Sequence, residues 1–220
     1  GSMPSEAAVR VEEVVNAFDY EYEAPTADTF AVHAEAAPSP NRQGYHLLHI
    51  GLKGKEVAKA ERKPTNLVFV IDVSGSMQPD NRLGLVKRSL RLLVEELEEK
   101  DNVGIVVYGS EAREVLQPTS AHHKDVILRA IDGLGTEGAT NAEAGLRMGY
   151  AMAARLHGES YETRVVLLSD GVANVGITGP GGLLETVAAQ RKRGSTISTS
   201  GRGMGSDNDV LMEQLADKGD

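Results

Sequence analysis

Three oxygen-bearing side chains follow a very hydrophobic segment at two-residue intervals. Asp72, Ser74 and Ser76 lie in IDVSGSM (residues 71–77), directly after NLVFV. Their side chains are short, so they reach only groups close to the backbone. A second hydrophobic run, RVVLLS, ends at Asp170, and Thr140 lies in GTEGATN, before a predicted helix. Because ligands of open α/β sheets bind beyond the carboxyl ends of the strands, we expect these five side chains at one rim.

The chemistry of this set points to a hard cation. It contains two carboxylates and three hydroxyls, and the chain has no cysteine, which disfavours zinc and copper. Mg²⁺ keeps several waters and uses only one or two carboxylates, whereas a full Ca²⁺ cage needs more carboxylate and carbonyl donors. Two acids around one divalent ion give a nearly neutral site, which would readily accept another carboxylate. The sequence therefore predicts a bound metal ion with one coordination position left for an acidic side chain of a partner.

The elements that would position these residues alternate between strands and helices after Pro64. We expect strands at residues 67–71, 103–108, 113–116, 164–169 and 195–200, and helices at 83–97, 123–134, 141–156, 183–192 and 207–216. The strands at 67–71, 103–108 and 164–169 are runs of mostly apolar residues, as in sheets covered on both faces, whereas the strand at 195–200 is polar. This alternation predicts an α/β fold with a doubly wound, mostly parallel central sheet flanked by helices.

The residues before Pro64 follow a different pattern. An amphipathic helix is expected at residues 9–18, and two strands at 29–36 and 45–52 are expected to pair antiparallel. A polar stretch that ends at Pro64 separates them from the rest. We therefore expect a small N-terminal α+β extension over residues 4–63 and the main domain over residues 64–220.

Composition and charge exclude several classes of function. The 220 residues carry 32 acids and 23 bases, for a net charge of -9, which disfavours nucleic acid and anionic lipid as partners. No apolar run in the sequence approaches the roughly 18 residues of a membrane span. The opening Gly-Ser-Met is typical of a cloning scar, so we expect that any natural signal or anchor was removed before Pro4.

The segments DVSGSM, GATN and LLSDG, in this order, resemble the metal-ion-dependent adhesion site (MIDAS) of von Willebrand factor type A (VWA) domains. The resemblance covers about Pro64 to the end, and the preceding region, with GLKGKE, resembles the N-terminal extension of bacterial VWA proteins. It implies a Rossmann-like VWA fold and a non-enzymatic adhesion or scaffold module. Export or attachment at the bacterial cell envelope is implied as well.

The resemblance also implies a role for each residue of the site. Ser74 and Ser76 would bind Mg²⁺ directly, with Mn²⁺ or Ca²⁺ as alternatives. Thr140 would join them when a ligand is bound, and Asp72 and Asp170 would act mainly through water. A Glu or Asp of a partner protein would take the sixth position. The last helix, which can shift with the state of the metal in relatives, would here be residues 207–216.

The sequence departs from the family pattern near its end. Ser195, Ser200 and Arg202 are polar where relatives have an apolar strand. They face outward, belong to an edge strand, or mark an altered sequence. Relatives also usually add a final strand and helix, which leaves two interpretations: a C-terminally truncated domain, or a strand supplied from elsewhere.

Two other functions remain open at this level. A metal-dependent phosphoester hydrolase would use Asp72 as nucleophile, but Ser74 stands where a second acid would be needed. The chain could also be an accessory subunit of an ATPase-driven assembly or metal-insertion complex. It has no Walker phosphate loop, so the motor would be another protein.

Overall fold

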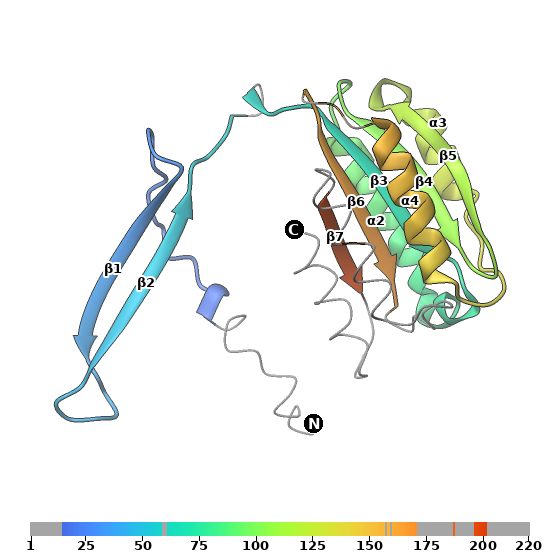
Figure 1. Ribbon diagram of the computed structural model, residues 1–220. Helices are drawn as coiled ribbons and strands as arrows, with labels where there is room; N and C mark the ends of the chain where they lie inside the picture. The colour runs from blue at the N-terminus through green and yellow to red at the C-terminus, as the bar shows by residue number, and fades with distance from the viewer. Residues whose placement is uncertain are drawn as a thin grey trace. The chain divides into compact units, whose positions relative to one another are not determined.

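The computed structural model describes residues 15–58, 61–156, 158, 160–170, 187 and 196–201, with only the backbone at Asp80 and residues 199–201. The chain divides into two compact units, residues 1–62 and 63–220 (Figure 1). Residues 9–14 of the predicted first helix and the predicted helix 207–216 lie outside the described residues, as do Ser195 and Arg202. Of the predicted helix 183–192, only Val187 is described, and it is helical and buried.

The N-terminal unit contains the expected pair of strands. β1 (Phe30–Pro38) and β2 (His46–Gly54) run antiparallel. One face carries exposed apolar side chains, with Val32 opposite Leu52. On the other face the ring of Tyr22 stacks on His33, with 4.6 Å between ring centroids. Gly51 lies opposite His33 and leaves room for the ring of Tyr22, because a Cβ atom at Gly51 would collide with the Tyr22 ring.

The second unit is built on a five-stranded sheet in the order β5-β4-β3-β6-β7 (Figure 1). The strands are β3 (Thr65–Asp72), β4 (Asn102–Tyr108), β5 (Ala112–Ser120), β6 (Glu162–Ser169) and β7 (Thr196–Gly201). All neighbours are parallel except β4 and β5. The predicted fold class is therefore confirmed, with β7 as the last strand of the described sheet.

In the described part of the chain the sheet is covered by α2 (Arg82–Glu96), α3 (Lys124–Asp132) and α4 (Ala142–Leu156). Short 3-10 turns lie at Gly75–Met77, Pro79–Asn81 and Ala121–His123. The helix expected at residues 123–134 is shorter, because the 3-10 turn takes its first residue and Gly133 ends it. The strand expected at residues 113–116 is longer, because it pairs with β4 along its length.

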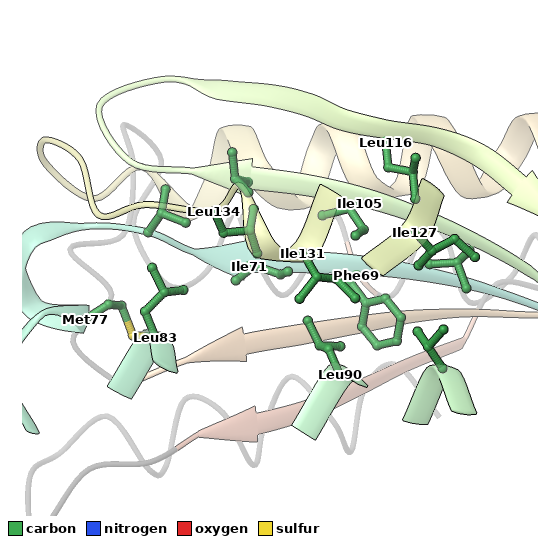
Figure 2. Packing of buried hydrophobic residues seen from close by; sticks show 14 residues of the cluster. Phe69, Ile71, Met77, Leu83, Leu90, Ile105, Leu116, Ile127, Ile131 and Leu134 are labelled. Atoms are coloured by element: carbon green, nitrogen blue, oxygen red, sulfur yellow. The ribbon is translucent and has the colours of Figure 1, made fainter. Parts of the chain in front are cut away.

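The two faces of β3 are buried against different helices. Val68 and Val70 pack with α4, whereas Phe69 and Ile71 pack with α2 and α3 (Figure 2). Burial on both faces explains why the strand reads as a continuous apolar run. On the α4 side a Cβ atom at Gly149 would collide with Val70, so glycine lets the helix approach the sheet closely.

A buried carboxylate secures the amino end of the central strand. Asp101 is fully buried, and its Oδ1 accepts a hydrogen bond of 2.8 Å from the backbone N–H of Thr65. Its Oδ2 accepts one of 3.0 Å from the backbone N–H of Glu98. Asp101 thus joins the start of β3 to the loop after α2, at the end of the strand opposite to Asp72.

Among the described residues, no helix has the length and apolar character required to cross a bilayer.

Candidate metal centre at the strand ends

Asp72 is the last residue of the central strand and is fully buried. Its Oδ1 accepts a hydrogen bond of 2.9 Å from the backbone N–H of Ser74, a local turn that short acidic side chains commonly form. Its Oδ2 accepts one of 3.1 Å from the hydroxyl of Ser169, at the end of β6. The carboxylate is therefore held from its own loop and from the neighbouring strand.

The hydroxyls of Ser74 and Ser76 lie 2.9 Å apart. Ser74 is buried and Ser76 half-buried, on either side of Gly75, where a 3-10 turn begins. The turn brings two side chains that are two residues apart onto the same side of the loop. Two oxygen atoms at this separation can bind one small cation together.

Asp170 follows β6 and is also buried, with a side chain that is 0% exposed. Its Oδ2 accepts a hydrogen bond of 2.7 Å from Nη1 of Arg82. The same Nη1 donates a longer one, of 3.3 Å, to the backbone oxygen of Ser76. Through this guanidinium the loop after β6 is connected to the loop after β3.

Thr140 is placed through its loop. The backbone N–H of Gly75 donates to the carbonyl of Gly138 at 3.2 Å, and that of Glu137 donates to the carbonyl of Val73 at 2.6 Å. Thr140 follows two residues later and is half-buried. The loop thus lies against the Asp72 loop. The other four candidates belong to one hydrogen-bonded network, in which Asp170 is reached through Arg82.

Burial disfavours the ionised form of the carboxyl groups in this network. Burial raises the pKa of the Asp72 carboxyl, the hydrogen bonds from Ser74 and Ser169 act in the opposite direction, and the negative charge of Asp170 raises it further. In the described part of the chain this network contains the carboxylates of Asp72 and Asp170 and the guanidinium of Arg82, so these three groups together carry one excess negative charge when ionised. A divalent cation would stabilise the ionised carboxylates.

A buried phenol hydroxyl lies beside the network. Tyr108 lies opposite Asp72 on β4 and is fully buried. Its hydroxyl makes no hydrogen bond within the described part of the chain. Burial and the nearby charge of Asp72 raise the pKa of this phenol well above its usual value. An unsatisfied buried hydroxyl is costly, and a water of a hydrated cation could satisfy it.

The donor set therefore fits a small hydrated cation. Among the described residues, no three His, Cys, Asp or Glu side chains cluster as a metal site of their own. Binding here would depend on the serine and threonine hydroxyls as well as on the two acids. All these donors are hard oxygen atoms, which suit Mg²⁺ or Mn²⁺.

Sequence analysis missed three contributors: Arg82, Tyr108 and Ser169. Ser169 and Tyr108 each end a strand, and this position is the signal that could have identified them. Arg82 carries no such signal, because its contact with Asp170 joins residues 88 positions apart in the chain.

The comparisons with known proteins agree with the fold and with the motif. Residues 66–220 match the model of the von Willebrand factor type A domain, and residues 1–49 match a second model described as von Willebrand factor. The chain therefore belongs to the von Willebrand factor type A domain family. Domains of this family commonly mediate protein interactions and adhesion.

The relatives include longer proteins. Uncharacterized protein YfbK of Escherichia coli is 40% identical over 100% of this chain, but the chain spans only 40% of the length of YfbK. The VWA domain of SpRpn10 has a TM-score of 0.58 at 14% identity, covering 71% of this chain and 82% of that one. The pilus adhesin SpaC from Lactobacillus rhamnosus GG has a TM-score of 0.55 at 17% identity, covering 87% and 34%. At these identities the structural matches concern the fold.

Proposed function

We propose that this protein is a protein-binding module that depends on a divalent cation, Mg²⁺ in the first place, and captures a Glu or Asp side chain of a partner protein. The observation that carries the proposal is the network at the carboxyl ends of β3 and β6. It brings Asp72, Ser74 and Ser76 together with Asp170, which lies almost 100 residues further along the chain.

Each residue has a separate task in this proposal. The hydroxyls of Ser74 and Ser76 bind the cation, and Thr140 joins them from its adjacent loop. Asp72 and Asp170 supply the negative charge and hold waters of the cation. The bound cation supplies a Lewis-acidic site for a carboxylate. Because three of the five donors are neutral hydroxyls, the centre keeps enough positive charge to attract that acid.

The family supports the kind of partner. Domains of this family commonly bind other proteins, and one structural neighbour is a pilus adhesin. The excess of acidic residues over basic ones makes nucleic acid a poor partner. We infer a binding role rather than catalysis, since Ser74 occupies the position where a phosphoester hydrolase would place a second acid.

The direct test is titration of the purified protein with MgCl2 by calorimetry. Wild type is expected to bind one equivalent, and Asp72→Ala and the double variant Ser74→Ala, Ser76→Ala are expected to lose binding while their circular dichroism stays unchanged. Asp132→Ala is a matched control, because Asp132 is an acid that pairs with Arg91 on the surface. It should bind Mg²⁺ like wild type.

A second measurement tests carboxylate capture. Bound Mn²⁺ accelerates the relaxation of nearby protons, so the methyl protons of acetate should relax faster with the Mn²⁺-loaded protein and return to normal with a chelator. Absence of cation binding in wild type, or binding that survives both substitutions, would overturn the proposal. Mn²⁺ binding without any effect on the relaxation of acetate would reject the proposal that one coordination position of the cation is open to a carboxylate.

A further inference from the structure

Arg82 is a cation built into the rim of the candidate metal centre. It is the first residue of α2, and its guanidinium contacts both the carboxylate of Asp170 and the backbone oxygen of Ser76. The side chain of Asp170 is 0% exposed, whereas that of Arg82 is 28% exposed. A partly exposed positive charge is therefore paired with a buried acid at the carboxyl end of β6.

The charges that the described residues bring to this rim can be counted in each state. Asp72 and Asp170 contribute two negative charges and Arg82 one positive charge, which leaves one negative charge for an incoming cation. A divalent cation turns this into one positive charge, and a partner's carboxylate then makes the site neutral. Without Arg82 the cation-loaded site would already be neutral, and the carboxylate would leave it negative.

We propose that Arg82 determines the preference of this site for an acidic ligand, weakening the binding of the cation and strengthening that of the carboxylate. The inference rests on the proposed metal site. Its physical reason is Coulombic: a guanidinium bonded to Asp170 repels a nearby divalent cation and attracts a nearby anion. The two effects have opposite signs, which distinguishes this role from a purely structural one.

Arg82→Gln tests both effects in one protein. We expect the affinity for Mg²⁺, measured by calorimetry, to rise roughly three- to tenfold, as for the loss of one charge in partly exposed surroundings. We expect the affinity of the Mn²⁺-loaded protein for acetate, measured from methyl-proton relaxation, to fall by a similar factor. Arg82→Lys keeps the charge and should stay closer to wild type in both measurements.

Arg88→Gln is the matched control, because Arg88 is an exposed arginine on the same helix. It removes the same charge from the protein and should change neither affinity appreciably. If Arg82→Gln weakens both ligands equally, Arg82 only holds the loops in place and the inference is overturned. Unchanged affinities in Arg82→Gln would overturn it as well, while the proposed function would stand on the wild-type titration.

A double variant covers the case in which Arg82→Gln fails to fold, because Asp170 is then left buried without its guanidinium. In Arg82→Gln, Asp170→Asn two neutral side chains replace the ion pair, and the loaded site regains the charge of wild type. At saturating Mn²⁺ its affinity for acetate should lie below that of Asp170→Asn alone, in which the charge of Arg82 remains. Equal affinities in these two variants would reject the inference. Absence of cation binding in wild type would reject both proposals.

Discussion

The hydroxyl of Ser169 donates a hydrogen bond of 3.1 Å to Oδ2 of Asp72 and thereby joins the ends of two neighbouring parallel strands. Both residues are buried, and they lie 97 positions apart in the chain. The contact fixes the orientation of an acid whose other oxygen is held by its own loop. The first prediction follows from this arrangement.

Ser169→Ala should weaken cation binding without unfolding the domain. The substitution removes one of the hydrogen bonds that orient Asp72, and loss of such a supporting contact typically reduces metal affinity by roughly tenfold or more. Calorimetric titration with MgCl2 is the measurement. Ser198→Ala is the control. Ser198 lies in the middle of β7 and accepts a hydrogen bond from Arg164 of β6. An affinity equal to wild type in Ser169→Ala would show that this contact does not support the site.

Asp101→Ala should have the opposite profile, with lower stability and normal cation affinity. The substitution leaves the backbone N–H groups of Thr65 and Glu98 without their acceptor. We expect the free energy of unfolding to fall by about 2–4 kcal/mol, measured by urea denaturation. Because Asp101 lies at the other end of β3 from Asp72, the Mg²⁺ affinity of the folded variant should not change. Loss of that affinity would contradict the separation of the two ends.

Gly149→Ala should destabilise the domain although alanine is the better helix former. Its Cβ atom would collide with Val70, so α4 must move away from the sheet. Overpacking of this kind costs about 1–3 kcal/mol, which exceeds the gain of roughly 1 kcal/mol in helix propensity. Gly133→Ala is the control, because a Cβ atom there meets its neighbours at ordinary distances, 3.5 Å and beyond. Val70→Ala combined with Gly149→Ala should recover part of the loss.

Tyr150→Phe should make the protein more resistant to alkali. Burial raises the pKa of the Tyr150 phenol, so the folded state retains this proton at pH values where the unfolded chain releases it. Stability from this group is complete below about pH 10, the pKa of an unfolded tyrosine, and decreases as the pH rises above it. The free energy of unfolding, measured between pH 8 and roughly 11, should therefore decrease less in Tyr150→Phe than in wild type.

The same substitution should cost little at neutral pH. The hydroxyl of Tyr150 has no hydrogen-bond partner among the described residues, so phenylalanine removes a buried polar atom without breaking a hydrogen bond to any of them. A free energy of unfolding within about 1 kcal/mol of wild type at pH 7 is expected. A larger loss would mean that the hydroxyl has a partner in solution.

Part of the candidate site could be predicted because its residues are local in the sequence. Asp72, Ser74 and Ser76 are spaced two residues apart after an apolar run, and the turn between them needs no distant partner. Asp170 could be added because it also ends a hydrophobic run, and such ends meet at one edge of a parallel sheet. Arg82 could not be added, since an arginine at a helix start is common and its partner is 88 residues away.

The sequence by itself determined the class of fold, through continuous apolar strands alternating with helices that have one apolar face. This periodicity predicts which faces of the strands and helices are buried, because removing apolar side chains from water is favourable. Only the tertiary structure decided that β3 lies between β4 and β6, which brings Asp72 to Ser169 and Arg82 to Asp170. The order of the strands in the sheet depends on the packing of all the elements together, so a local pattern of residues does not predict it.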